Sequence, residues 1–231
     1  MTGVQTCALP ILDVDFMAER ISRNREFLTK VFQEILGIVC DEDGVTFDTE
    51  NITMEPITVE KKYPGTRFFF TAHMDSIVQK MSVDIGFGDV VTPYPASIDF
   101  PLLLPNIPSV NLQAYSLETV IAEKFHTMLD RDEYNSRMKD FFDCYQLLTK
   151  RELHDETLYD AIKATFDNRE LEYNPKLKLF TAEFVNDANR QMQWKLFLRK
   201  IQWKEELSFN VVMQVITDRL KPMAEKYWNK K

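Results

Sequence analysis

The stretch Leu12-Asp13-Val14-Asp15-Phe16 alternates apolar and acidic residues, which is the pattern of a β-strand with two unlike faces. Residues two apart on a strand point to the same side, so Asp13 and Asp15 are predicted to lie together. The apolar residues of the stretch, Phe16 among them, are expected to pack behind this pair. Because adjacent carboxylates repel each other unless a cation or a proton neutralises them, the pattern indicates a site for a divalent cation and a phosphate. The other interpretation is a solvated strand face.

A second strand-like segment, Met81-Ser82-Val83-Asp84-Ile85, repeats this alternation. Asp84 is predicted to lie on its polar face, with Val83 and Ile85 on the core face. If the two segments were neighbouring strands, Asp84 would be a third carboxylate beside the first pair. Three acids from two strands are the arrangement that holds two magnesium ions for phosphoryl or nucleotidyl transfer. The sequence alone leaves open whether the two strands are neighbours.

The composition is that of a soluble globular protein. The chain has 231 residues, of which 45% are hydrophobic and 28% are charged, and it is long enough to bury a substantial core. Its formal net charge of −8 speaks against a non-specific nucleic-acid-binding protein. The segment from Arg190 to Lys231 nevertheless carries more basic than acidic residues. This basic end is interpreted either as a local contact for a phosphate backbone or as a solvated helical surface.

The three cysteines, Cys7, Cys40 and Cys144, are isolated in the sequence and form no C-x-x-C pair. Neither a zinc site nor a disulfide framework is indicated, and a reducing, cytoplasmic location is expected. No apolar run is long enough to span a bilayer, so no membrane partner is expected.

Residues 1–11 do not match the segment that follows them. They resemble a translated sequencing-adapter string, and they lack the basic region with which a signal peptide begins. We therefore expect residues 1–11 to be a non-native leader, with the native chain starting upstream of Leu12.

The periodicity predicts strands in the first part of the chain and helices in the second, which is an α+β fold. A turn with Pro64 and Gly65 at its centre is expected to join two of the strands. A proline-rich connector over residues 93–108 separates the two parts, since prolines deny backbone donors to helix and sheet. Ser116 is expected to cap the next helix. Beyond the two acidic strands, the expected elements are helix 17–36, strands 44–47, 52–61 and 66–73, and helices 116–129, 137–149, 156–166, 180–200 and 209–228.

Four segments of the helical part carry a further pattern. They are Tyr115-Ser116-Leu117-Glu118, Ala122-Glu123-Lys124-Phe125, Leu129-Asp130-Arg131 and the stretch from Asn135 to Asp143. Together with the two acidic strands, in this order and spacing, they resemble the AbiEii/AbiGii family of nucleotidyltransferase-like toxins from bacterial toxin–antitoxin and phage-defence systems. The resemblance covers the chain from Leu12 onward.

The resemblance implies a polymerase-β-like nucleotidyltransferase core, with a mixed sheet and helices, over residues 12–113 and a helical domain over residues 114–231. It makes Asp13 and Asp15 the metal-binding catalytic pair, with Asp84 as the third acid of a two-magnesium site. Enzymes of this fold also have a Gly-Gly-Thr or Gly-Ser element upstream of the acid pair, whose backbone N–H groups hold the triphosphate. No such element precedes Leu12, so the core is expected to be incomplete at its N-terminus.

The resemblance also assigns roles to residues of the helical part. Lys124 is implied to be the catalytic lysine that contacts the nucleotide phosphates. Asp140 and Asp143 correspond to the family's late Arg-Asp-x-x-Asp motif, with Lys139 in the place of arginine. This makes Asp143 a catalytic residue and Asp140 a nucleotide-binding one. Without the resemblance, Lys124 is interpreted as a solvated lysine and the two acids, one helical turn apart, as partners in surface salt bridges.

The implied activity is the magnesium-dependent transfer of a nucleoside monophosphate from an NTP to an RNA, tRNA 3′ ends included, or to a protein. A cognate antitoxin is the implied protein partner. The first alternative is a non-catalytic, truncated or degenerate toxin that retains only antitoxin binding. The second is a metal-dependent nuclease that uses the same acids.

Overall fold

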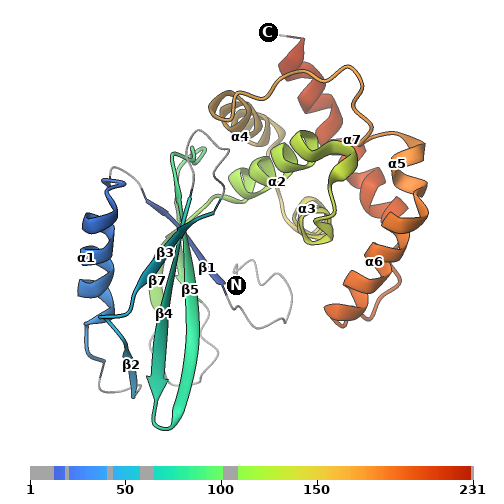
Figure 1. Cartoon of the computed structure of the whole chain (residues 1–231). Helices are drawn as coiled ribbons and strands as arrows, with labels where there is room; N and C mark the ends of the chain where they lie inside the picture. Colours follow the sequence, from blue (N-terminus) through green and yellow to red (C-terminus); the bar gives the residue numbers. More distant parts are fainter. Residues whose placement is uncertain (1–12, 19–20, 41–43, 58–64, 101–108, 230–231) are drawn as a thin grey trace. The chain divides into compact units, whose positions relative to one another are not determined.

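The computed structural model describes residues 13–18, 21–40, 44–57, 65–100 and 109–229, without the side chains of residues 13–15. These residues belong to two compact units, Pro10–Asp89 and Val90–Lys231, and each unit is described by itself. Figure 1 shows the first unit as a sheet with one helix, and the second as a group of helices with a two-stranded ribbon. Residues 1–11 and the expected turn at Pro64 lie outside the described residues.

A mixed sheet forms the first unit. Its strands follow the order β1-β5-β4-β2, and β3 also pairs with β4. β1 runs parallel to β5, whereas β2, β3 and β5 run antiparallel to β4. The elements are β1 (Asp13–Ala18), α1 (Arg25–Leu36), β2 (Val45–Phe47), β3 (Thr53–Pro56), β4 (Thr66–Met74) and β5 (Ile77–Phe87).

A tight turn joins β4 to β5. Met74 and Ile77 are already a register pair, so the turn consists of Asp75 and Ser76 alone. Asp75 has a φ of 52°, the left-handed conformation that two-residue hairpin turns require. From this turn, nine register pairs run without interruption to Thr66 opposite Ile85.

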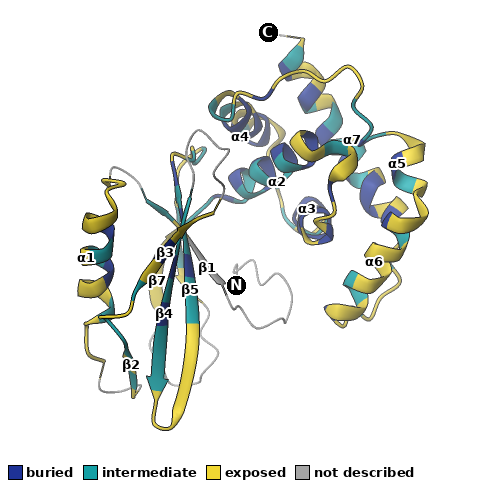
Figure 2. Cartoon of the chain, viewed as in Figure 1, coloured by how far each residue is buried: buried dark blue, intermediate teal, exposed yellow. Residues whose placement is uncertain are grey.

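The core of the first unit lies between α1 and one face of the sheet. Phe32 of α1 is buried against Phe68 of β4, and their rings stack with centroids 3.9 Å apart. Figure 2 shows this side of α1 as buried and its outer side as exposed. Alternation along β5 places Val83 and Ile85 in the same core, while Asp84 between them is excluded from it. The two faces predicted for the second acidic strand are therefore confirmed.

Two predictions for the start of this unit are wrong. The helix expected over 17–36 begins only at Arg25, because Met17 and Ala18 pair with β5 and Asn24 caps the helix by accepting a hydrogen bond from the backbone N–H of Phe27. Phe16, which was expected to pack behind the acidic pair, is 51% exposed, because β1 is an edge strand of the sheet. The strands expected over 44–47, 66–73 and 81–86 and the start of the strand expected over 52–61 are confirmed as β2 to β5.

Helices pack around a second core in Val90–Lys231. Large aromatic side chains fill it, among them Phe125 of α2, Phe141 of α3, Trp194 of α6 and Phe209 of α7. The rings of Phe141 and Phe209 meet edge to face with centroids 5.3 Å apart. The elements are β6 (Ala96–Phe100), β7 (Val110–Ala114), α2 (Leu117–Arg131), a 3-10 turn (Asp132–Tyr134), α3 (Met138–Lys150), α4 (Asp155–Asn168), α5 (Ala182–Asn186), α6 (Ala188–Lys200) and α7 (Phe209–Trp228).

Two predictions for this unit need correction. The expected connector over 93–108 contains β6, which pairs antiparallel with β7, because neither strand includes a proline and the ladder donors are intact. The single helix expected over 180–200 is divided at Asp187, whose side chain caps α6 by accepting a hydrogen bond of 2.8 Å from the backbone N–H of Arg190. The other expected helices are confirmed, and Ser116 caps α2 as predicted.

The α+β class predicted from the sequence is confirmed. Strands give way to helices at Ser116, whereas the compact units divide after Asp89, so the domain division after residue 113 stays a prediction. Within the part of the chain that the structure describes, no helix combines the length and the apolar character needed to cross a membrane. Cys40 and Cys144 are free thiols.

Candidate functional site

The two acidic strands predicted to hold a metal are neighbours in the sheet. Asp13 lies opposite Ser82, and Asp15 lies opposite Asp84, in the parallel register of β1 with β5. Paired positions on neighbouring strands share a face of the pleat, so the backbone assigns positions 13, 15 and 84 to one face. This is the face that α1 does not cover. The adjacency that the sequence left open is therefore present.

Asp84 has a strong partner that the sequence did not indicate. The guanidinium of Arg67 on β4 donates two hydrogen bonds to it, from Nε to Oδ1 and from Nη2 to Oδ2, both at 2.6 Å. The Asp84 side chain is 15% exposed and that of Arg67 is 39% exposed. A fork of this kind fixes the orientation of a carboxylate and neutralises its charge. Asp84 is thus held in place by a cation from its own sheet.

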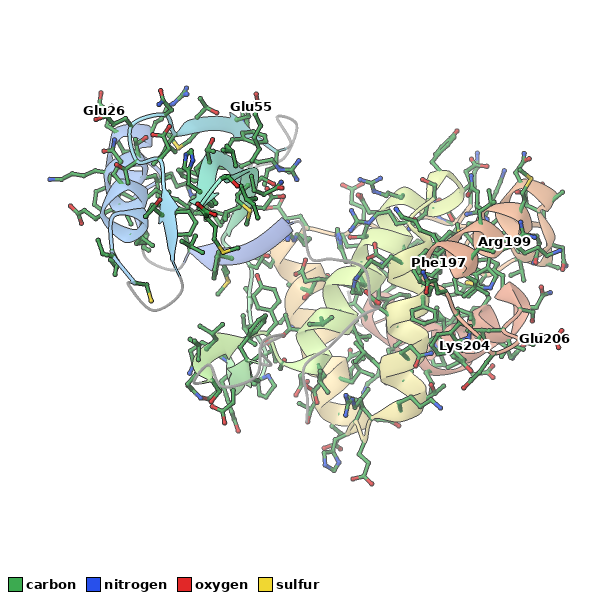
Figure 3. All side chains as sticks on the ribbon, turned by 90° about the horizontal axis from the view of Figure 1, so that it is seen from below. Glu26, Glu55, Phe197, Arg199, Lys204 and Glu206 are labelled. Carbon is green, nitrogen blue, oxygen red and sulfur yellow. The ribbon has the colours of Figure 1, made fainter. Side chains whose placement is uncertain are left out.

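A row of three acids and one arginine, here called the acidic row, crosses four strands at this level. Asp15, Asp84, Arg67 and Glu55 occupy consecutive register positions on β1, β5, β4 and β3 (Glu55 is labelled in Figure 3). Sequence reasoning missed Arg67, which begins the largely apolar run Arg67-Phe68-Phe69-Phe70. The alternation along β4 puts Arg67 on the face opposite the buried Phe68, but only the register of β4 with β5 reveals that its partner is Asp84.

The donor set at this row suits a hard divalent cation, because carboxylate oxygens are the ligands that magnesium takes from proteins. Among the side chains that the structure describes, no group of three or more His, Cys, Asp or Glu residues is arranged to hold a metal. The side chains of Asp13 and Asp15 are not among those described. The support for the predicted metal site therefore comes from the backbone register of β1 with β5.

Lys124, Asp140 and Asp143 come together in the other unit. Lys124 on α2 donates to Oδ1 of Asp140 at 2.9 Å and lies 2.8 Å from Oδ2 of Asp143, both on α3. The side chains of the two acids are 3% and 0% exposed, and that of Lys124 is 19% exposed. The interpretations of Lys124 as a solvated lysine and of the acids as partners in surface salt bridges are therefore wrong. The acids face the core side of α3, against α2.

Further cations complete this lysine cluster, which consists of Lys124, Arg137, Lys139, Asp140 and Asp143. Arg137 donates from Nε to Oδ2 of Asp140, and Lys139 donates to Oδ2 of Asp143 at 2.7 Å. Oδ1 of Asp143 is buried and accepts no hydrogen bond from the described residues. Sequence reasoning noted Lys139 but missed Arg137, although its position three residues before Asp140 is a helical pairing distance.

Burial and charge oppose each other in this cluster. Burial alone would lower the pKa of Lys124, but the carboxylates of Asp143 and Asp140 outweigh it and raise that pKa above its ordinary value. Burial would likewise raise the pKa of Asp140, yet Lys124 and Arg137 hold that pKa below its usual range. Lys124 and Asp140 are therefore charged at neutral pH. One N–H of the Lys124 ammonium is left without an acceptor among the described residues, since Nζ carries three hydrogens and contacts two acids.

Two solved structures from Helicobacter pylori resemble the chain. The crystal structure of JHP933 has 13% sequence identity and a TM-score of 0.45, and the match covers 94% of this chain and 77% of that chain. The structure named "putative nucleotidyltransferase from H. pylori" has 11% identity and a TM-score of 0.43, with 95% of this chain and 80% of that chain covered. The comparison with curated proteins finds no match.

A family model matches most of the length of this chain. The model described as "Nucleotidyl transferase AbiEii toxin, Type IV TA system" matches residues 12–215, which contain the acidic row and the lysine cluster. The chain therefore belongs to the AbiEii family of nucleotidyltransferase toxins, the toxin components of type IV toxin–antitoxin systems.

Proposed function

We propose that this toxin transfers a nucleoside monophosphate from an NTP, in a metal-dependent reaction, to a hydroxyl group of an RNA, tRNA 3′ ends included, or of a protein. The acceptor oxygen forms a bond to the α-phosphorus, the bond from that phosphorus to the leaving oxygen breaks, and pyrophosphate departs. The observation that supports this proposal is the register of Asp15 with Asp84 on adjacent strands, in a chain of nucleotidyltransferase family. A cognate antitoxin counteracts the activity.

Asp13, Asp15 and Asp84 would hold the metal in this proposal. Their positions on one face of two neighbouring strands support the assignment, because adjacent carboxylates need a cation to offset their repulsion. Magnesium supplies positive charge that offsets the charge of the triphosphate and favours ionisation of the acceptor hydroxyl. Asp84 keeps its orientation through the fork with Arg67, so the third acid is positioned before the metal and the nucleotide arrive.

Lys124 contacts the nucleotide phosphates in the proposed reaction. Its side chain is 19% exposed, and one ammonium N–H has no acceptor among the described residues, so a phosphate oxygen can bind it. Asp140 and Asp143 act through Lys124, since they fix the position of its ammonium group. An exposed lysine would have to lose side-chain freedom when the substrate binds, which costs on the order of 1 kcal/mol or more.

The test of this function is a transfer assay on the full chain. We expect label from an α-³²P NTP to appear in RNA or protein when magnesium is present, and to disappear from both when EDTA removes the metal. Label from the γ-phosphate should never be transferred. Shortening of end-labelled RNA without NTP would favour the nuclease instead. The absence of transfer from every NTP would leave the non-catalytic antitoxin-binding module.

Arg67 gives a separate prediction about the metal. Its guanidinium occupies both oxygens of Asp84 and repels a cation nearby, so Arg67→Ala should strengthen Mn²⁺ binding about fivefold, as expected for like charges a few ångströms apart at a half-exposed site. Transfer should nevertheless slow, because Asp84 loses its fixed orientation. Electron paramagnetic resonance of free Mn²⁺ measures the binding without any turnover.

Arg67→Lys is the matched control, since it keeps the positive charge and loses the two-pronged geometry. It should bind Mn²⁺ close to the wild-type affinity. Equal or weaker Mn²⁺ binding by Arg67→Ala would show that Arg67 does not compete with a metal at Asp84.

A further inference from the structure

Helix α6 carries a stripe of positive charge on its exposed side. Its residues Met192, Lys195, Leu196, Arg199 and Lys200 recur at intervals of three and four, so they share one face, and all are exposed. The opposite face holds the buried Arg190 and Trp194. Figure 2 shows most of α6 as exposed. We call Lys195, Arg199 and Lys200, together with Lys204 in the following segment, the α6 cations.

The α6 cations are not used inside the protein. Among the described residues, none of the four side chains takes part in a salt bridge, a hydrogen bond or a contact with an aromatic ring. Other exposed lysines in this unit do have such partners: Lys163 contacts Asp167, Lys178 contacts Glu133 and Lys221 contacts Glu225. α6 itself contains no acidic residue over its whole length, Ala188–Lys200. The nearest acids in sequence are Asp187, which caps the helix, and the exposed Glu205 and Glu206.

We infer that the α6 cations bind the phosphate backbone of an RNA. In a chain with a net charge of −8, four unpaired cations in ten residues create a local positive field that a polyanion can use. The cations of the helix itself, Lys195 to Lys200, span about 8 Å of helix axis, a length over which one strand of a duplex carries roughly two to three phosphates. The three cations of α6 therefore have about as many phosphates within reach, and Lys204 follows beyond the end of the helix.

A protein partner fits this stripe less well. Burying Lys195, Arg199 and Lys200 against an apolar surface would leave three desolvated charges, each at a cost of several kcal/mol by general estimates. A phosphate strand supplies an anion to each cation and leaves the contacts hydrated. Met192 and Leu196, which are 61% and 51% exposed, are available for contact with sugars or bases between the charges. Figure 3 labels Arg199 on α6, and Lys204 and Glu206 on the segment after it.

This inference deepens the proposed function, on which it rests for the role of RNA as the acceptor. RNA binding is measured without NTP and in EDTA, so its failure is distinct from a failure of nucleotide transfer. The probe is a fluorescein-labelled RNA hairpin with a single-stranded 3′ end, titrated with the full chain and followed by fluorescence anisotropy between 50 and about 200 mM KCl, the range in which phosphate contacts dominate.

We expect replacement of all four α6 cations by glutamine to weaken RNA binding at least tenfold. The slope of log affinity against log salt should flatten by about 3, since each lost phosphate contact removes about 0.7 to 0.9. The control carries the same charge change at lysines that have partners, as Lys163→Gln, Lys178→Gln, Lys221→Gln and Lys226→Gln. The partner of Lys226 is the Tyr159 ring, whose centroid lies 3.8 Å from Nζ. It should keep most of the wild-type affinity and the wild-type slope.

Three outcomes would overturn the inference. They are equal weakening by the two fourfold variants, wild-type affinity in the α6 variant, and no binding of the hairpin by the wild-type chain. Arg199→Glu provides a second test that leaves the rest of the helix intact. It should weaken RNA binding while the tryptophan fluorescence spectrum stays that of the wild type, because Trp194 lies on the other side of α6.

Discussion

Asp15→Asn should lower the rate of nucleotide transfer by about a thousandfold, which is the scale for loss of a group that stabilises charge in a transition state. The substitution is nearly isosteric, so the parallel pairing of β1 with β5 should persist. What changes is the charge: Asp15 is the register partner of Asp84, and an amide is a far weaker ligand for a hard cation than a carboxylate. Transfer of label from an α-³²P NTP measures the loss, and Mn²⁺ binding should weaken in the same variant.

Asp99→Asn is the matched control for this prediction. Asp99 is an exposed aspartate on β6 that accepts a hydrogen bond from Nδ2 of Asn111. Its replacement should change neither transfer nor Mn²⁺ binding. Transfer by Asp15→Asn at the wild-type rate would remove the acidic row from the mechanism, even if the chain proved to be a nucleotidyltransferase.

Lys124→Met should destabilise the helical unit by about 3 to 5 kcal/mol, the range for removing one partner of a buried ion pair. The two acids that remain, Asp140 and Asp143, have side chains that are 3% and 0% exposed, so water cannot solvate the charge that Lys124 now offsets. Arg137 and Lys139, which are 54% and 50% exposed, replace that charge only in part. Urea unfolding followed by tryptophan fluorescence measures the effect.

The choice of probe matters because the chain has two compact units. The three tryptophans, Trp194, Trp203 and Trp228, all belong to Val90–Lys231, so their fluorescence reports on the unit that contains Lys124. Lys163→Met is the control, since Lys163 forms an exposed ion pair of 2.7 Å with Asp167, and its urea midpoint should barely move. Adding Asp143→Asn to Lys124→Met should recover part of the loss, and an unchanged midpoint in Lys124→Met would mean that the cluster does not stabilise the unit.

Local patterns predicted the faces of the strands but not their partners. Alternation over 81–85 correctly placed Asp84 away from the core, because a strand has a period of two whatever lies beside it. The neighbour of that strand depends on contacts far apart in sequence, such as Arg67 with Asp84, and no local period records them. The burial of Phe16 also depends on the neighbours of its strand. Its apolar character predicts burial, but β1 lies at the edge of the sheet and leaves Phe16 half exposed.

The helical part was predicted well where periodicity was strong and poorly where a single polar residue decided the boundary. Asp187 and Asn24 each set a helix start by accepting a backbone hydrogen bond, which a residue pattern alone does not distinguish from a polar position within a helix. Lys124 illustrates the limit for the candidate site. A lysine in an amphipathic helix usually points into solvent, and only the packing of α2 against α3 brings two buried acids to Lys124.

The tight turn at Asp75 and Ser76 sets the register of the acidic row. Counting from Met74 and Ile77, the antiparallel register carries Arg67 to Asp84 only because the turn has two residues. If the pairing slipped by a single residue, Arg67 would face Val83 or Ile85, and its strand would present the opposite side chains to the polar face. The pairing of Asp84 with Arg67 is therefore set by the number of residues in the turn rather than by any residue near Asp84. Substitutions at Asp75 or Ser76 are therefore compatible with an intact acidic row. An insertion or a deletion in this turn is not, because it would shift the register of Arg67 against Asp84.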